Sequence, residues 1–105
     1  MSNGGPAITA EAVVAALRAH EAELRAAGLR SLSIFGSVAR GEAGEGSDVD
    51  LAAEIERDGR VTLLTLVRLE ERLAEILGRP VDLVTEPIRR DRLRERVERD
   101  RVRAY

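Results

Sequence analysis

Two short stretches decide how this sequence folds: Gly-Ser-Val-Ala-Arg-Gly at residues 36–41 and Ser-Asp-Val-Asp-Leu at residues 47–51. The first follows an apolar run at residues 29–35, and the second opens another run at residues 48–55. Short apolar runs bounded by Gly, Ser or Asp are typical of β-strands. We therefore expect two strands, the first closed by a Gly-Ser turn with a short helical turn at residues 37–40, and the second opened by a pair of carboxylates.

The surrounding sequence predicts three helices and a third strand. Apolar residues at helical spacing follow Thr9, a predicted N-cap, and continue to Gly28. Residues 62–77 repeat this spacing with Leu and Ile, residues 81–85 form the third strand, and a charged helix is expected at residues 88–102. The order α-β-β-α-β-α predicts an α/β (α+β) domain in which helices cover a small sheet.

The composition is that of a small single domain. The chain has 105 residues, with the domain expected at residues 9–105 after a flexible Gly- and Pro-containing N-terminus at residues 1–8. The absence of Cys excludes disulfides and thiol nucleophiles, and the absence of Lys excludes a Walker-type or Schiff-base lysine. No apolar run has the length of a membrane span and no signal segment opens the chain, so we expect a cytoplasmic protein without a membrane partner.

Charge is distributed unevenly along the chain. The net charge is -2, yet residues 88–103 carry eight Arg against four acidic residues. This excess predicts a basic face on the C-terminal helix, which is either solvated and stabilised by i,i+4 pairs or a docking surface for an acidic partner or for RNA. Aromatic residues make up 2% of the sequence, so direct nucleic-acid binding by base stacking is not expected.

The carboxylate pair has the clearest chemistry. Side chains alternate along a strand, so Asp48 and Asp50 are expected to point the same way. Two carboxylates so placed repel each other unless a cation lies between them, and Mg²⁺ prefers oxygen ligands and shares its shell with phosphates. Asp82, on the third strand, is the candidate third carboxylate. Two metal ions in such a site clamp the attacking and leaving oxygens of an in-line displacement, and Asp82 can help to remove a proton from the attacking hydroxyl.

The Gly-Ser turn supplies candidate contacts to a nucleotide. Gly36 allows the backbone to approach a triphosphate closely, and Ser37 offers a hydroxyl and N–H groups at a helix start to the β- and γ-phosphates. Arg40 is predicted to contact phosphate or to cap the local turn. Ser47 is predicted to cap or orient the loop before Asp48.

The joined pattern of residues 36–41 and 47–51 resembles the signature of the DNA polymerase β-like nucleotidyltransferase superfamily. More narrowly, the chain resembles the minimal nucleotidyltransferase (MNT) branch, the antitoxin partners of HEPN-domain toxins. The resemblance extends over nearly the whole chain, and Val81-Asp82-Leu83-Val84 after the Leu-rich helix adds to it.

This resemblance implies a nucleotidyltransferase fold, with a small mixed β-sheet flanked by helices and with Mg²⁺ and ATP at the sheet edge. It implies transfer of AMP from ATP to an acceptor hydroxyl, which in the antitoxin branch is a tyrosine of the HEPN RNase toxin. Carried over, Gly36 and Ser37 would hold the triphosphate. Asp48 and Asp50 would bind both metals, and Asp82 would be the third carboxylate.

Two other functions stay open at this point. The chain could be a non-catalytic antitoxin that neutralises its toxin by forming a complex, or a stand-alone transferase that modifies a small molecule in a pocket between subunits. Because 105 residues leave no room for a separate acceptor domain, we expect a partner protein to supply the acceptor. The sequence leaves open whether the chain forms a homo- or hetero-oligomer.

Overall fold

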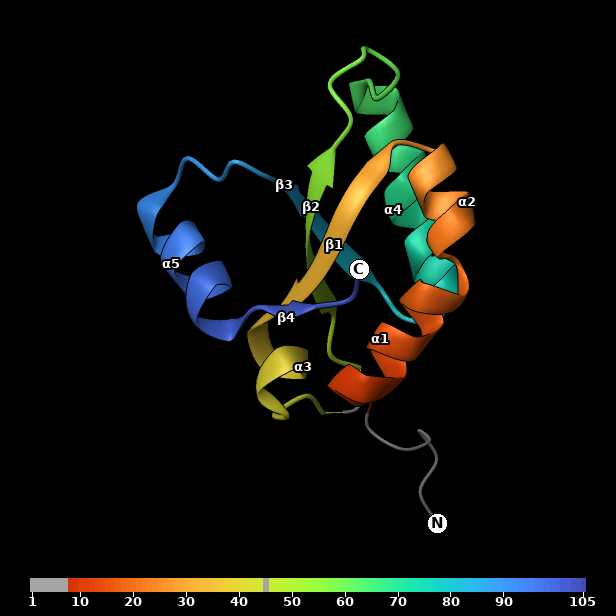
Figure 1. The fold of residues 1–105 in the computed structure, drawn as a ribbon. Helices are drawn as coiled ribbons and strands as arrows, with labels where there is room; N and C mark the ends of the chain where they lie inside the picture. The colour runs from red at the N-terminus through yellow and green to blue at the C-terminus, as the bar shows by residue number, and fades with distance from the viewer. Residues whose placement is uncertain (1–7, 45) are drawn as a thin grey trace.

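The computed structural model describes residues 8–44 and 46–105 (Figure 1). Its helices are α1 (Ala10–Ala19), α2 (Glu21–Ala26), α3 (Gly36–Arg40), α4 (Leu63–Leu77) and α5 (Asp91–Asp100). Its strands are β1 (Leu29–Phe35), β2 (Val49–Ile55), β3 (Val81–Thr85) and β4 (Val102–Arg103). The predicted α+β class is confirmed. Apart from Ile8, the N-terminal segment expected to be flexible lies outside the described residues.

One mixed sheet with the strand order β3-β2-β1-β4 organises the fold. β1 runs antiparallel to both β2 and β4, whereas β2 and β3 are parallel. The parallel pair needs a crossover, and α4 provides it. Thr62 starts that helix as predicted, since its hydroxyl accepts a hydrogen bond from the Thr65 N–H at 3.2 Å, and Gly78 closes it with φ 68°.

Helices cover both faces of the sheet. α1, α2 and α4 lie on one side and α5 lies on the other (Figure 1). The larger core cluster joins α1, α2 and α4 to the sheet. It contains Val13, Leu17, Leu24, Leu32, Ile34, Leu51, Leu69 and Leu73. The smaller cluster lies under α5 and contains Phe35, Ala52, Ile88 and Val97. By strand alternation, Asp50 shares the α5 face with Ala52.

The first helix is interrupted, contrary to the prediction of one helix from Thr9 to Gly28. His20 separates α1 from α2 with φ -111° and ψ 15°. Its backbone N–H bonds to the Leu17 carbonyl at 3.1 Å, while its ring nitrogen lies 2.9 Å from the Ala16 carbonyl oxygen. The side chain thus occupies the carbonyl that the next α-helical hydrogen bond would use, which local sequence patterns do not reveal.

The C-terminal helix is shorter than predicted. α5 ends at Asp100 instead of reaching Val102, and Val102 pairs with Ile34 of β1 as the start of β4. The helix ends early because Ala104 and Tyr105 pack into the larger core cluster, where Tyr105 is 91% buried. Among the described helices, none has both the length and the apolar character that a membrane span requires.

Candidate active site

Parallel pairing of β2 and β3 brings two of the predicted carboxylates together. Asp50 and Asp82 are direct register partners, on strands that lie about 4.8 Å apart in a sheet. Asp50 is half-buried and Asp82, on the edge strand, is exposed. Two residues 32 positions apart in sequence therefore form one acidic pair on the α5 face.

The Gly-Ser turn lies directly against this pair. β1 places Phe35 opposite Asp50, so Gly36 follows at the same end of the sheet. Gly36 has φ +76°, and a Cβ atom built on it would overlap the Asp50 Oδ2 atom. Only glycine combines this left-handed backbone with such a close approach. Ser37, half-buried, begins the first turn of α3 immediately beyond.

The electrostatics of Asp50 reflect this crowding. Burial raises the pKa of its carboxyl, and the charges of Asp82 and then Asp48 raise it further. Arg96 of α5 and Arg40 of α3 act in the opposite direction. Asp48 lies just before β2 and is exposed, so the strand begins one residue later than predicted, yet the Asp48 charge still acts on Asp50.

These carboxylates have the oxygen chemistry that Mg²⁺ takes, and a cation would relieve the repulsion that acts on Asp50. Across residues 8–44 and 46–105, however, no group of three or more Asp, Glu or His side chains is arranged as a ready metal site. The structure brings Asp50 and Asp82 into register, and Asp48 is an exposed residue just before β2. The donor set therefore suits a hard cation without being preassembled around one.

Arg40 has protein partners. Its Nη1 donates to Asp100 Oδ2 at 2.7 Å and its Nε donates to Glu42 Oε1 at 2.9 Å. Asp100 is buried at the end of α5 and also accepts from Arg99 at 3.0 Å. Arg40 thus ties α3 to α5, a contact across 60 residues that the sequence did not indicate.

The loop before Asp48 is held by side-chain hydrogen bonds. Ser47 Oγ accepts from the Gly44 N–H at 2.9 Å, which is the local capping geometry predicted for this serine. Arg79, just after α4, donates to the Gly44 carbonyl at 3.2 Å and lies 3.5 Å from the Ser47 carbonyl. Arg79 was not predicted to support the site, because nothing in the local sequence connects it with residues 44–47.

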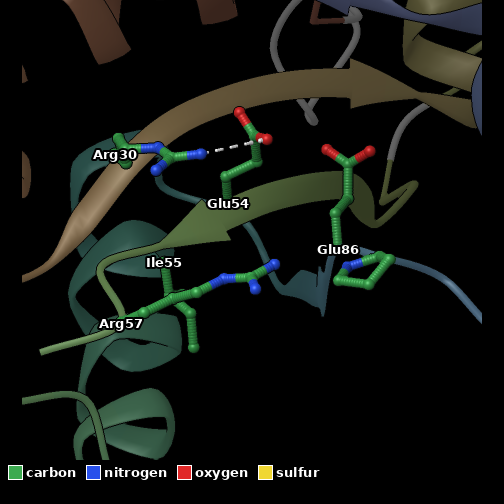
Figure 2. A pocket seen from close by; sticks show the side chains of 6 residues that line it. Arg30, Glu54, Ile55, Arg57 and Glu86 are labelled. Carbon is green, nitrogen blue, oxygen red and sulfur yellow. Dashed lines mark hydrogen bonds and ion pairs between the residues drawn. The ribbon is translucent and has the colours of Figure 1, made fainter. Parts of the chain in front are cut away.

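A separate polar cavity of about 220 Å³ lies farther along the sheet (Figure 2). Arg30, Glu54, Arg57 and Glu86 line it, and Arg30 and Glu54 face each other across it at 3.5 Å. Glu54 is four residues beyond Asp50, or about 13 Å along the strand. The cluster of Phe35, Ala52, Ile88 and Val97 occupies the same face, so this cavity is not part of the carboxylate site.

Comparison with known proteins identifies the family. Residues 17–104 match the nucleotidyltransferase domain family. The chain is 45% identical over 78 residues to the protein adenylyltransferase MntA of Thermococcus cleftensis, an alignment that covers 73% of this chain and 77% of that protein. The chain belongs to the nucleotidyltransferase domain family. The resemblance stated from residues 36–41 and 47–51 is therefore confirmed, and the protein is a nucleotidyltransferase.

Solved structures agree on the nucleotidyltransferase fold. One described as a minimal nucleotidyltransferase has a TM-score of 0.74 at 39% identity, covering 93% of this chain and 98% of that chain. A chain in the complex of a tri-AMPylated HEPN toxin from Shewanella oneidensis with an MNT antitoxin has a TM-score of 0.64. At 20% identity, with 89% of this chain and 71% of that chain covered, the second likeness shows the fold alone.

Proposed function

We propose that this nucleotidyltransferase transfers AMP from ATP to a tyrosine hydroxyl of a partner HEPN-domain toxin and thereby acts as its antitoxin. The observation that carries the proposal is the Asp50–Asp82 register pair against the Gly36 backbone. The 45% identity to a protein adenylyltransferase supports a protein acceptor. The fold shared with a complex of an AMPylated HEPN toxin supports the kind of partner.

In this reaction the phenol oxygen attacks the α-phosphorus of ATP. A new P–O bond joins AMP to the tyrosine, the bond from the α-phosphorus to the bridging oxygen breaks, and pyrophosphate leaves. Asp82 is the exposed member of the pair on an edge strand, so we assign it to accept the phenol proton. Gly36 and Ser37 hold the triphosphate through backbone approach, N–H groups and the serine hydroxyl.

Asp48, Asp50 and Asp82 would also hold Mg²⁺, which accounts for acidic side chains beside a site for an anionic substrate. When bound, the ions supply charge neutralisation at the phosphate oxygens. Ser47 and Arg40 act indirectly in this proposal: Ser47 shapes the loop before Asp48, and Arg40 holds α3 against α5.

The test uses the purified chain, its HEPN partner, Mg²⁺ and ATP labelled at either the α- or the γ-phosphate. We expect label on a tyrosine of the partner from α-labelled ATP only. Asp82→Asn should slow transfer by roughly 100-fold or more, the usual contribution of a positioned proton acceptor. Asp91→Asn, an exposed acid on α5 that pairs with Arg94, is the matched control and should transfer normally. Transfer of the γ-label, or full transfer by Asp82→Asn, would contradict the proposal.

The non-catalytic antitoxin makes a different prediction in cells. If complex formation alone silences the toxin, Asp50→Asn should still protect cells that express it. In the proposed reaction, Asp50→Asn loses protection while still binding the partner. Co-purification of the Asp50→Asn variant with the toxin, compared with survival of the same cells, separates the two functions.

A further inference from the structure

One arginine of α5 stands beside the carboxylate site without a protein partner. Within the described part of the chain, Arg92 and Arg96 are exposed and make no hydrogen bond or ion pair. They lie four positions apart, so they share one side of the helix. Their neighbours differ: Arg94 pairs with Asp91, and Arg99 pairs with Asp100.

The packing of α5 fixes where Arg96 stands. The next residue, Val97, is fully buried and belongs to the same cluster as Phe35 and Ala52. Phe35 immediately precedes the Gly36-Ser37 turn, and Ala52 lies two residues beyond Asp50 on the same face. Arg96 also lies one helical turn before Asp100, which accepts a hydrogen bond from Arg40 of α3, so it is placed toward the helix that begins at the Gly36-Ser37 turn.

Its charge reaches the site. Among the charged groups that act on Asp50, Arg96 follows Asp82 in strength and exceeds Asp48 and Arg40. Arg92 lies one helical turn farther from Asp100, the residue of α5 that binds Arg40 of α3. The two otherwise similar arginines are therefore distinguished by how far along α5 each lies from its contact with α3.

A triphosphate bound at the Gly36-Ser37 turn would be stabilised by a positively charged side chain. Because the chain has no Lys, arginine is the basic side chain that can add to the charge of bound Mg²⁺. Arg40 is engaged by Glu42 and Asp100, and Arg101 is engaged by Glu86 at 2.6 Å. Arg96 keeps its guanidinium available, and a guanidinium donates two parallel hydrogen bonds to phosphate oxygens.

We propose that Arg96 binds the β- and γ-phosphates of ATP from α5, opposite the Gly36-Ser37 turn. The inference rests on the proposed function for its ligand. It adds a nucleotide-binding residue outside the motif of residues 36–41 and 47–51. This residue belongs to α5, for which the sequence predicted only a basic face. Arg96 stabilises the bound nucleotide and the pyrophosphate as it leaves, whereas Arg92 lies a turn farther from α3 and takes no part.

The test measures binding without an acceptor protein. The full chain with Mg²⁺ is titrated by calorimetry with α,β-methylene-ATP, which cannot release pyrophosphate, and separately with AMP. Arg96→Gln should weaken binding of the triphosphate analogue by roughly 10-fold, the loss expected for a hydrogen bond between charged groups, and leave AMP binding unchanged. Arg96→Lys should restore part of the affinity, since it keeps the charge but not the planar fork.

Arg92→Gln is the matched control, and its affinity should stay within about twofold of the wild type. Equal weakening by Arg92→Gln and Arg96→Gln would show a general charge effect and overturn the assignment. Wild-type affinity in Arg96→Gln, with its thermal unfolding unchanged, would overturn it as well. Failure of the wild type to bind the analogue at all would instead contradict the proposed function itself.

Discussion

At the scale of single residues, Gly36 leaves no room for a side chain beside the Asp50 carboxylate. The backbone of Gly36 and the carboxylate of Asp50 occupy adjacent space, so any side chain at position 36 must displace the carboxylate. Gly41, five residues later, shares the same φ of +76°, yet a Cβ there would meet nothing within 4 Å. Comparing substitutions at Gly36 and Gly41 therefore distinguishes the effect of backbone strain from the effect of displacing the Asp50 carboxylate.

Gly36→Ala should abolish most nucleotidyl transfer, because the new methyl group pushes Asp50 away from Asp82. Both Gly36→Ala and Gly41→Ala carry the strain of a left-handed alanine, on the order of 1–2 kcal/mol, and both should unfold at a lower temperature. Only Gly36→Ala should lose activity beyond that shared destabilisation. Initial transfer rates measured well below both melting temperatures test this, and equal activity in the two variants would refute it.

Sequence patterns predicted Gly36, Asp50 and Asp82 because each depends on local rules: strand alternation, turn chemistry and the order of elements. They did not predict the partners of Arg40, since Asp100 is 60 residues away and its position depends on how α5 packs. Arg79 was missed for the same reason. Their roles follow from tertiary contacts that no short window of sequence contains.

At the scale of elements, the contact between α3 and α5 depends on a buried acid. Hydrogen bonds from Arg99 and from Arg40 lower the pKa of Asp100 to about 2, although burial opposes the shift. An unfolded aspartate titrates near pH 3.9. This group therefore stabilises the fold above that pH, and its contribution is lost as the pH falls through about 2.

Asp100→Asn should lower the melting temperature at pH 7, because Arg40 and Arg99 lose the negatively charged carboxylate to which both donate hydrogen bonds. Between about pH 4 and pH 2 the difference from the wild type should shrink, since acid protonates the wild-type carboxyl as well. Glu95→Gln, an exposed acid on the same helix, should have no such effect. Thermal unfolding followed by circular dichroism across this pH range provides the measurement, and a constant difference would count against the contact.

The C-terminal strand shows where element prediction from sequence fails. Charged residues at helical spacing continue through Arg101 and Arg103, so the pattern favours a helix to Val102. Tertiary contacts decide otherwise: Arg101 donates to Ser33 at 3.0 Å and to Glu86, and the Tyr105 hydroxyl donates to the Leu29 carbonyl at 3.1 Å. A two-residue strand is too short to leave a periodic signal.

At the scale of the whole molecule, the larger core and the carboxylate pair lie on opposite faces of the sheet. The face under α1, α2 and α4 holds the larger core and carries none of the predicted site residues of β2 and β3. The face under α5 holds a small core of four buried residues next to Asp50 and Asp82. Mutations in the two cores should therefore reduce stability alike but affect catalysis differently.

Val13→Ala and Val97→Ala test this division, because both valines are fully buried in helices, on opposite faces. Each truncation should cost on the order of 1–3 kcal/mol of unfolding free energy. Val97→Ala should also raise the KM for ATP several-fold, because it loosens the seat of α5 and so displaces Arg96 from the phosphate turn. Val13→Ala should keep the wild-type KM, since Val13 packs on the face of the sheet opposite Asp50 and Asp82. Urea unfolding and transfer kinetics at low temperature measure both effects, and an equal change of KM in the two variants would mean that α5 is only a structural cover.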